Sequence, residues 1–152
     1  MDQSSWNLWS ATSKGDQAYF FFRADKAAPF PNGAIVKLVD GKLHADDAPA
    51  QHAVFLVVSD LNAKWKGDPA PSPAEEHLGH WCCFLGQVPV RVRGRVTAGA
   101  YVGPACDGSG RGVVVATPGA APVVGIALAG KDGDGDGVVR AMSFAGLNAI
   151  NG

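Results

Sequence analysis

The stretch that decides the fold covers residues 84–115 and reads FLGQVPVRVRGRVTAGAYVGPACDGSGRGVVV. In its first part Val88, Val90 and Val92 are apolar, while polar residues stand at most of the positions between and beside them. A period of two is typical of a strand with one buried and one solvent-exposed face. Glycines and the sequence DGSG at 107–110 then divide the stretch into further short strands. The sequence therefore predicts a compact antiparallel β unit with tight turns.

The rest of the chain has the same punctuated character. Its 20 glycines and 10 prolines are spread along the sequence, and no apolar stripe of helical period is long enough for a substantial helix. Frequent turns between short apolar runs are typical of an all-β meander, sandwich or barrel. Further strands are expected over residues 18–23, 34–39, 42–45, 53–58, 122–129 and 138–144. We therefore predict an all-β fold of short antiparallel strands and hairpins, barrel-like or sandwich-like.

The expected organisation is one domain over residues 18–146. A polar N-terminal arm, residues 1–17, precedes it, and a short tail, residues 147–152, follows it. Residues 59–79 form the longest irregular segment. A loop of this length inside a compact domain is usually functional or part of an interface.

Two of the expected strands carry unusual apolar runs. Residues 53–58 read AVFLVV, and such a continuous run predicts a central strand covered on both faces. Residues 20–22 are three consecutive phenylalanines, which cannot all face one core because strand side chains alternate. That strand is either buried on both faces or covered by another subunit.

A covering subunit would make these phenylalanines part of an interface. Tryptophans in the polar arm and in the long segment are further candidates, because large aromatic side chains are favoured at interfaces. The arm's two indoles have an equal alternative, which is to fold back on their own core. The candidate interface residues are Trp6, Trp9, Phe20, Phe21, Phe22 and Trp65. We therefore predict that the chain's partner is another copy of itself, in a homo-oligomer.

Charge and hydropathy exclude other partners. The formal net charge is −1 and the pI is about 6.4, whereas nucleic-acid or anionic-membrane binders normally carry a basic surplus. Arg91, Arg93 and Arg95 are expected on a solvated strand face. The longest apolar run is too short to span a bilayer, and the N-terminus lacks the features of a signal peptide. We expect a protein that is cytoplasmic or assembled into a particle or appendage.

Asp132, Asp134 and Asp136 have the opening spacing of a calcium-binding loop, with Gly137 after them. The twelfth position is Ser143, where such a loop requires a bidentate glutamate, and the flanking residues are strand-like. An acidic, glycine-rich hairpin loop explains the same residues. We therefore predict no cofactor, with a weak calcium site as the alternative.

His77, His80, Cys82 and Cys83 are four potential zinc ligands within seven residues. Adjacent cysteines in a strand point to opposite faces, and no second ligand pair follows at finger-like spacing. The favoured interpretation is that the two histidines lie in a loop and that the two cysteines are small buried residues of the strand that follows. With Cys106 alone elsewhere, the cysteines are expected to be free thiols.

Ser59 and Asp60 follow the AVFLVV strand, and His44 and His52 are near them in sequence. A hydroxyl, a carboxylate and an imidazole are the components of a hydrolytic triad. Nearness in sequence is not triad geometry, however, and no G-x-S-x-G motif occurs. We therefore predict no catalytic residue here, with Ser59 and Asp60 as weak candidates.

A resemblance rests on an ordered series of motifs: NGAIVKLVDGKLHADDAP at 32–49, AVFLVVSD at 53–60, the stretch 84–115, and a last hairpin. This series resembles the C-terminal domain of phage neck-appendage and tail-spike proteins known as the peptidase G2, or intramolecular-chaperone autoprocessing, family. Residues 98–105, AGAYVGPA, are similar to that family's G-D-Y-x-x-P-S element, although Gly-Ala-Tyr replaces Gly-Asp-Tyr.

The resemblance implies a β-rich domain that forms trimers and helps a fibrous partner to assemble. In some members the domain also cuts itself off with a serine and an aspartate near its N-terminal boundary, where this chain has Ser13 and Asp16. The favoured hypothesis is a non-enzymatic assembly module, with a trimer as the expected state. The alternative is a self-processing endopeptidase in which an N-terminal serine or threonine attacks the preceding peptide, with Asp16 or Asp60 as base. A binding module with a weak calcium site is the second alternative.

Overall fold

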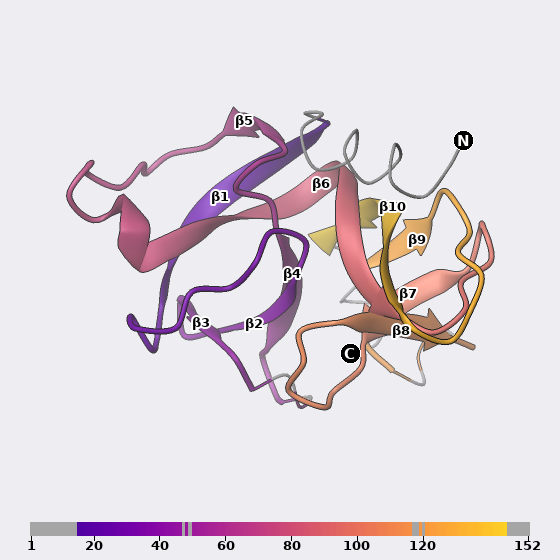
Figure 1. Cartoon of the computed structure of the whole chain (residues 1–152). Helices are drawn as coiled ribbons and strands as arrows, with labels where there is room; N and C mark the ends of the chain where they lie inside the picture. Colours follow the sequence, from indigo (N-terminus) through magenta and orange to yellow (C-terminus); the bar gives the residue numbers. More distant parts are fainter. Residues whose placement is uncertain (1–14, 47, 49, 117–118, 120, 146–152) are drawn as a thin grey trace.

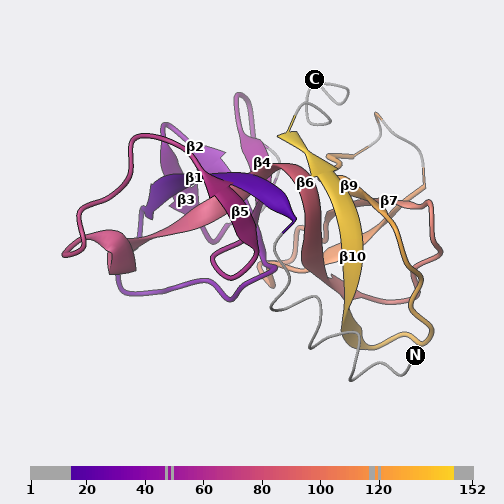
Figure 2. The same cartoon turned by 90° about the horizontal axis from the view of Figure 1, so that it is seen from above.

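Strand β6 (Gly79–Arg93) is the longest element, and the fold is built on it (Figure 1). The computed structural model describes residues 15–46, 48, 50–116, 119 and 121–145. The strands that precede β6 lie on one side of it and those that follow lie on the other (Figures 1 and 2). The all-β fold class predicted from the sequence is confirmed, and the chain forms a single domain.

The strands before β6 close with it into a five-stranded barrel. They are β1 (Asp16–Arg23), β2 (Ile35–Val39), β3 (Lys42–His44) and β4 (Val54–Val58). Pairing runs from β6 to β1, β3, β2 and β4 and returns to β6. A fifth strand, β5 (Ala63–Lys66), pairs with β1 outside this ring and is the last in the strand order.

The strands after β6 return to it in the same way. They are β7 (Tyr101–Pro104), β8 (Gly112–Val115), β9 (Gly125–Ala127) and β10 (Asp136–Phe144). Pairing runs from β6 to β8, β7, β9 and β10 and back to β6. The first half of β6 therefore belongs mainly to the barrel, and its second half to this group.

Neighbouring residues of β2, β4 and β6 face two different cores. The barrel core contains Ala34, Val36, Leu43, Leu56, Val58 and Cys82. The second core includes Ile35, Phe55, Val57, Cys83, Val88, Val90 and Val92. Two predictions are confirmed by this alternation, namely the doubly covered strand at 53–58 and the buried valine face of β6.

The tight turn predicted at Asp40 and Gly41 joins β2 to β3. Both residues have positive φ, 51° and 77°, as a type I′ turn requires. The predicted β7–β8 and β9–β10 hairpins are also formed. These local features could be predicted from the sequence because each depends on a few adjacent residues.

The structure also differs from the sequence prediction. Three pairings are parallel, those of β1 with β3, β1 with β5, and β6 with β8. They arise because closure brings together strands that are not sequence neighbours. The segment expected to be irregular contains β5 and a 3₁₀ turn, η1 (Glu76–Leu78), and β1 begins inside the expected arm. In the part of the chain that the structure describes, no helix is long and apolar enough to cross a membrane.

Candidate functional site

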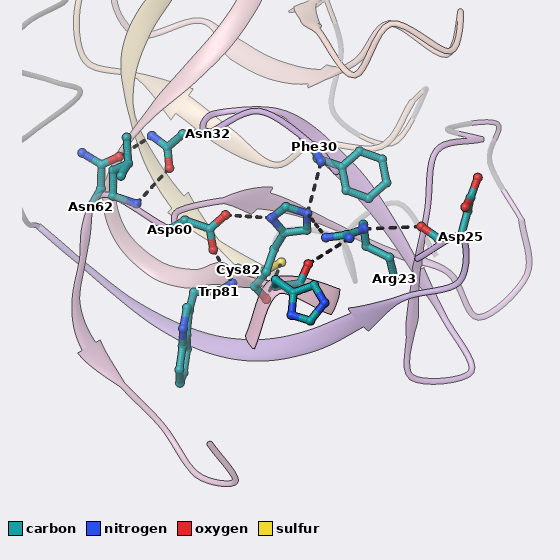
Figure 3. Close-up of polar contacts among 11 residues, drawn as sticks. Arg23, Asp25, Phe30, Asn32, Asp60, Asn62, Trp81 and Cys82 are labelled. Carbon is teal, nitrogen blue, oxygen red and sulfur yellow. Dashed lines mark hydrogen bonds and ion pairs between the residues drawn. The ribbon is translucent and has the colours of Figure 1, made fainter. Parts of the chain in front are cut away.

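The turn between β4 and β5 carries two polar residues that bind different partners. The Ser59 hydroxyl donates to Asp16 Oδ1 at 2.8 Å. Asp60, the next residue, accepts from His80 Nδ1 at 2.7 Å and from the Trp81 amide at 2.8 Å (Figure 3). Pairing of β1 with β5 and β6 places Asp16 here, opposite Ala63 and Gly86. Two of the sequence candidates, Asp16 and Ser59, are therefore brought together.

Asp16 is a buried carboxyl with one unsatisfied oxygen. The residue is 2% exposed, and no N–H or O–H group donates to its Oδ2, which leaves the weakly donating Cys83 thiol as the other group beside the carboxyl. Burial raises the pKa of Asp16 from 3.8 to about 6, against the opposing effects of the Ser59 hydroxyl and the Cys83 thiol. Burial and the neighbouring Asp16 charge raise the pKa of the Cys83 thiol in turn. Cys83 therefore stays protonated at neutral pH, whereas Asp16 passes from its acid to its carboxylate form near pH 6.

His80 is the centre of a second buried network. Its Nε2 accepts from the Phe30 amide and from Arg23 Nη1, each at 3.1 Å (Figure 3). Because both partners are donors, Nε2 carries no proton, and Nδ1 carries the proton that is donated to Asp60. Arg23 also donates to the backbone carbonyls of Asp25, Lys26 and His77. This network ties β1 and β6 to the loop that follows β1.

The hydrogen bonds of Ser59 and Asp60 are not those of the triad considered from the sequence. The Ser59 hydroxyl is bonded to Asp16, and Asp60 is bonded to His80, not to His44 or His52. Ser59 is also 0% exposed, so its hydroxyl is inaccessible to a separate substrate.

A groove of about 350 Å³ lies beside this site, where the register of β1 and β5 shifts. It is lined by Gly15, Asp16, Gln17, Lys64 and Trp65. The Trp65 ring packs edge-on against Tyr19, with 5.6 Å between ring centroids, and Tyr19 stacks on Phe84 at 4.6 Å. These contacts hold Trp65 in place at the edge of the groove while leaving it 47% exposed.

Trp65 also begins a row of exposed apolar side chains. Gln17 pairs with both Trp65 and Leu85, and Leu85 pairs with Phe144. Directly paired residues of neighbouring strands share a face of the sheet. Leu85 is 41% exposed and Phe144 is 51% exposed. We call Trp65, Leu85 and Phe144 the apolar row.

The other interface candidates lie elsewhere. Phe21 packs against the barrel core, whereas Phe20 packs on the other side of β1 beside Trp81, with Phe22 in contact with Phe20. This strand is thus packed on both faces within the chain, the first of the two alternatives considered. Trp6 and Trp9, like the catalytic candidate Ser13, lie outside the described residues.

The acidic loop before β10 is organised by positive side chains. Asp136 pairs with Arg93 and Arg111, and Lys131 donates to the carbonyls of Gly94, Asp132 and Gly133. Among the described residues, no three His, Cys, Asp or Glu side chains are grouped so as to hold a metal ion. The hypothesis of a calcium site at Asp132, Asp134 and Asp136 thus rests on their spacing alone.

The four potential zinc ligands are also dispersed in the structure. Cys82 and Cys83 face the two different cores, as adjacent strand residues should. His80 is engaged with Asp60, and His77 contributes a backbone carbonyl to Arg23. None of the three cysteines is in a disulfide bond, as predicted.

Comparison with known proteins adds no relative: no protein-family model, curated protein or solved structure matches the chain. The resemblance to the peptidase G2 family therefore remains a prediction from sequence patterns. Sequence reasoning missed the Arg23–His80 network, since 57 positions separate the two residues. The available signal was a charged residue, Arg23, directly after the aromatic run of β1.

Proposed function

We propose that this chain is a structural assembly module that associates with copies of itself. The observation that carries the proposal is the apolar row, in which Trp65, Leu85 and Phe144 are 47%, 41% and 51% exposed. Leu85 and Phe144 are directly paired, and Gln17 of β1 lies between Leu85 and Trp65. Single exposed apolar residues are ordinary, but contiguous ones mark interaction sites. The row also adjoins the groove, which offers a concave surface for a protruding side chain.

Two further features support a second copy as the occupant. The net charge of −1 gives little long-range repulsion between copies. The resemblance to a family of trimeric assembly domains, although carried by sequence patterns alone, points in the same direction and makes a trimer the expected state.

Light scattering and native mass spectrometry test the proposal. We expect a multiple of the 15.7 kDa chain mass, most simply three copies. Replacing Leu85 and Phe144 together by lysine should produce monomers, because two charges would be buried at the contact. Val114→Lys is the matched control, since Val114 is 41% exposed but lies on β8, outside the row. A wild-type monomer at high concentration contradicts the proposal.

A second candidate function, self-processing, is favoured by the bond between the Ser59 hydroxyl and Asp16. In this reaction Ser59 Oγ would attack a backbone carbonyl of the chain's N-terminal part, and its proton would pass to the Asp16 carboxylate. The proton would then go to the departing amine, leaving an ester that water hydrolyses. A carboxyl with a pKa of about 6 is suited to accept and return a proton near neutral pH.

Intact mass under denaturing conditions tests this second candidate. Self-processing should leave a fragment lighter than 15.7 kDa, and Ser59→Ala should preserve the full mass. Ser72→Ala is the control, because Ser72 is an exposed hydroxyl in the loop before η1. A wild-type chain that keeps its full mass after prolonged incubation shows that Ser59 is not a nucleophile.

A further inference from the structure

The loop between β1 and β2, residues 24–34, is fastened to the barrel at two buried side chains. Arg23, the last residue of β1, donates to two carbonyls of the loop, and the Phe30 amide donates to His80 Nε2 at 3.1 Å (Figure 3). In the part of the chain that the structure describes, residues 25–31 make no other hydrogen bond to a residue outside the loop. Arg23 and His80 therefore hold this segment in place.

His80 can accept from its two donors only while Nε2 carries no proton. Nε2 accepts from the Phe30 amide and from Arg23 Nη1, and Nδ1 donates the single proton of the neutral ring to Asp60. We call the two bonds to Nε2 the latch. A proton on Nε2 would occupy the lone pair that both donors share, and it would place an imidazolium beside a guanidinium. Protonation of the ring and a closed latch therefore exclude each other.

Phe30 connects the latch to the barrel core. Its ring packs against that core and lies 5.4 Å from the His80 ring, measured between centroids. His80 itself is 5% exposed. If the Phe30 amide loses its acceptor, the ring is no longer held against the core. Opening of the latch should therefore uncover apolar surface at this end of the barrel.

The other groups around His80 leave the direction of the effect unchanged. From the β4–β5 turn, Asp60 attracts an imidazolium, but it is bonded to Nδ1, away from the latch, so its attraction remains when the latch opens. From β1, Arg23 repels an imidazolium only while the latch is closed. The Cys82 thiol of β6 donates to the His80 carbonyl, and burial raises the pKa of this thiol, which stays neutral. From η1, His77 contributes only a carbonyl, which accepts from Arg23.

The loop contributes two charged side chains of opposite sign, Asp25 and Lys26. Both are exposed, so solvent screens their charges. The Asp25 carboxylate accepts from the Ala27 amide within the loop, and the two residues offer Arg23 their carbonyls. Neither side chain therefore stabilises a proton on His80 in the closed state.

We propose that protonation of His80 at Nε2 opens the latch, so that residues 25–31 and the Phe30 side chain form an acid-sensitive flap over the end of the barrel. This switch does not require self-association. Because the open state binds one more proton than the closed state, the ratio of closed to open molecules should fall by up to about tenfold per pH unit. Histidine is the side chain that ordinarily changes charge between pH 5 and 8, so the fall is expected in that range.

Amide hydrogen exchange, followed by NMR between pH 5 and 8 and corrected for the intrinsic exchange rate, tests the switch in the wild type. Protection of the Phe30 amide should fall as the pH falls, by up to about tenfold per unit. The Ile35 amide is the internal reference, because it donates to the carbonyl of Gly110 and neither partner titrates. Its protection reports the stability of the fold and should not follow that of Phe30.

Nitrogen NMR of the His80 ring in the same samples shows when Nε2 gains its proton. The midpoint of that titration should coincide with the loss of Phe30 protection. A Phe30 amide that stays as protected as before, relative to Ile35, while the ring gains its proton overturns the proposal. A ring that stays neutral down to pH 5 overturns it as well.

Three variants assign the effect to His80. His80→Gln removes the titrating ring, so the Phe30 amide should lose its pH dependence; if this variant does not fold, the wild-type measurements still decide. His77→Gln is the matched control, because it removes an exposed imidazole nearby and keeps the carbonyl that accepts from Arg23. Asp16→Asn removes the buried carboxyl that titrates near pH 6. Both should keep the wild-type pH dependence of Phe30, and its loss in either one would assign the switch to a different group.

Discussion

Replacing Asp16 by asparagine should make folding stability less sensitive to pH. Burial raises the pKa of Asp16 from 3.8 in the unfolded chain to about 6 in the fold, so the folded state binds the proton more tightly. This contribution to stability is complete below pH 3.8 and is lost as the pH rises to about 6. Since a pKa difference of one corresponds to about 1.4 kcal/mol, the loss is at most about 3 kcal/mol.

Urea unfolding of the monomer, at low protein concentration between pH 4 and 8, measures this effect. Asparagine keeps the shape of the side chain and can still accept from Ser59, but it never ionises. The wild type should therefore lose about 2 to 3 kcal/mol relative to Asp16→Asn between pH 4 and 7. Equal pH dependence of the two proteins would refute the reasoning, because the buried carboxyl would then ionise without cost.

Other perturbations address the rest of the structure. Arg23→Met should destabilise the fold by about 3 kcal/mol in urea unfolding, because it leaves buried acceptors without a donor. Lys64→Met, at an exposed position, is the control and should change the free energy of unfolding little. Val90→Ala, at a fully buried position, should cost about 2 to 3 kcal/mol in the same assay and leave the midpoint of the pH effect unchanged. Gly41→Ala should cost about 1 kcal/mol, measured by thermal unfolding, since residue 41 needs a positive φ; a neutral result would mean that the turn rearranges.

Much of the fold could be predicted because the decisive signals are local. The alternation of Val88, Val90 and Val92 indicates a strand with one buried face, and the Asp40–Gly41 pair indicates a type I′ turn. Neither inference requires knowledge of distant residues. Strand order is different, because the parallel contact of β1 with β3 follows from closure of the whole ring.

The candidate site depends on such distant contacts. Ser59 and Asp16 are 43 positions apart, and only the joint pairing of β1 with β5 and β6 brings them together. The sequence offered Ser59 beside Asp60, and residue types alone gave no reason to prefer Asp16 as the partner. In the fold, Asp60 is already hydrogen-bonded to His80 and the Trp81 amide, and this leaves Asp16 as the partner of Ser59.

The two carboxylates beside the β4–β5 turn show what is unusual about Asp16. Both oxygens of Asp60 accept hydrogen bonds, so this fold is able to satisfy a carboxylate at the turn. Asp16 has an unpartnered oxygen and a raised pKa, and a neutral side chain there would be more stable at neutral pH. A group that costs stability is a candidate for function, and the hydrogen bond from Ser59 makes self-processing the function to test. Processing requires the hydroxyl, so Ser59→Ala should keep the full chain mass while the wild type loses a fragment. If both proteins keep the full mass, the buried carboxyl has no role in processing.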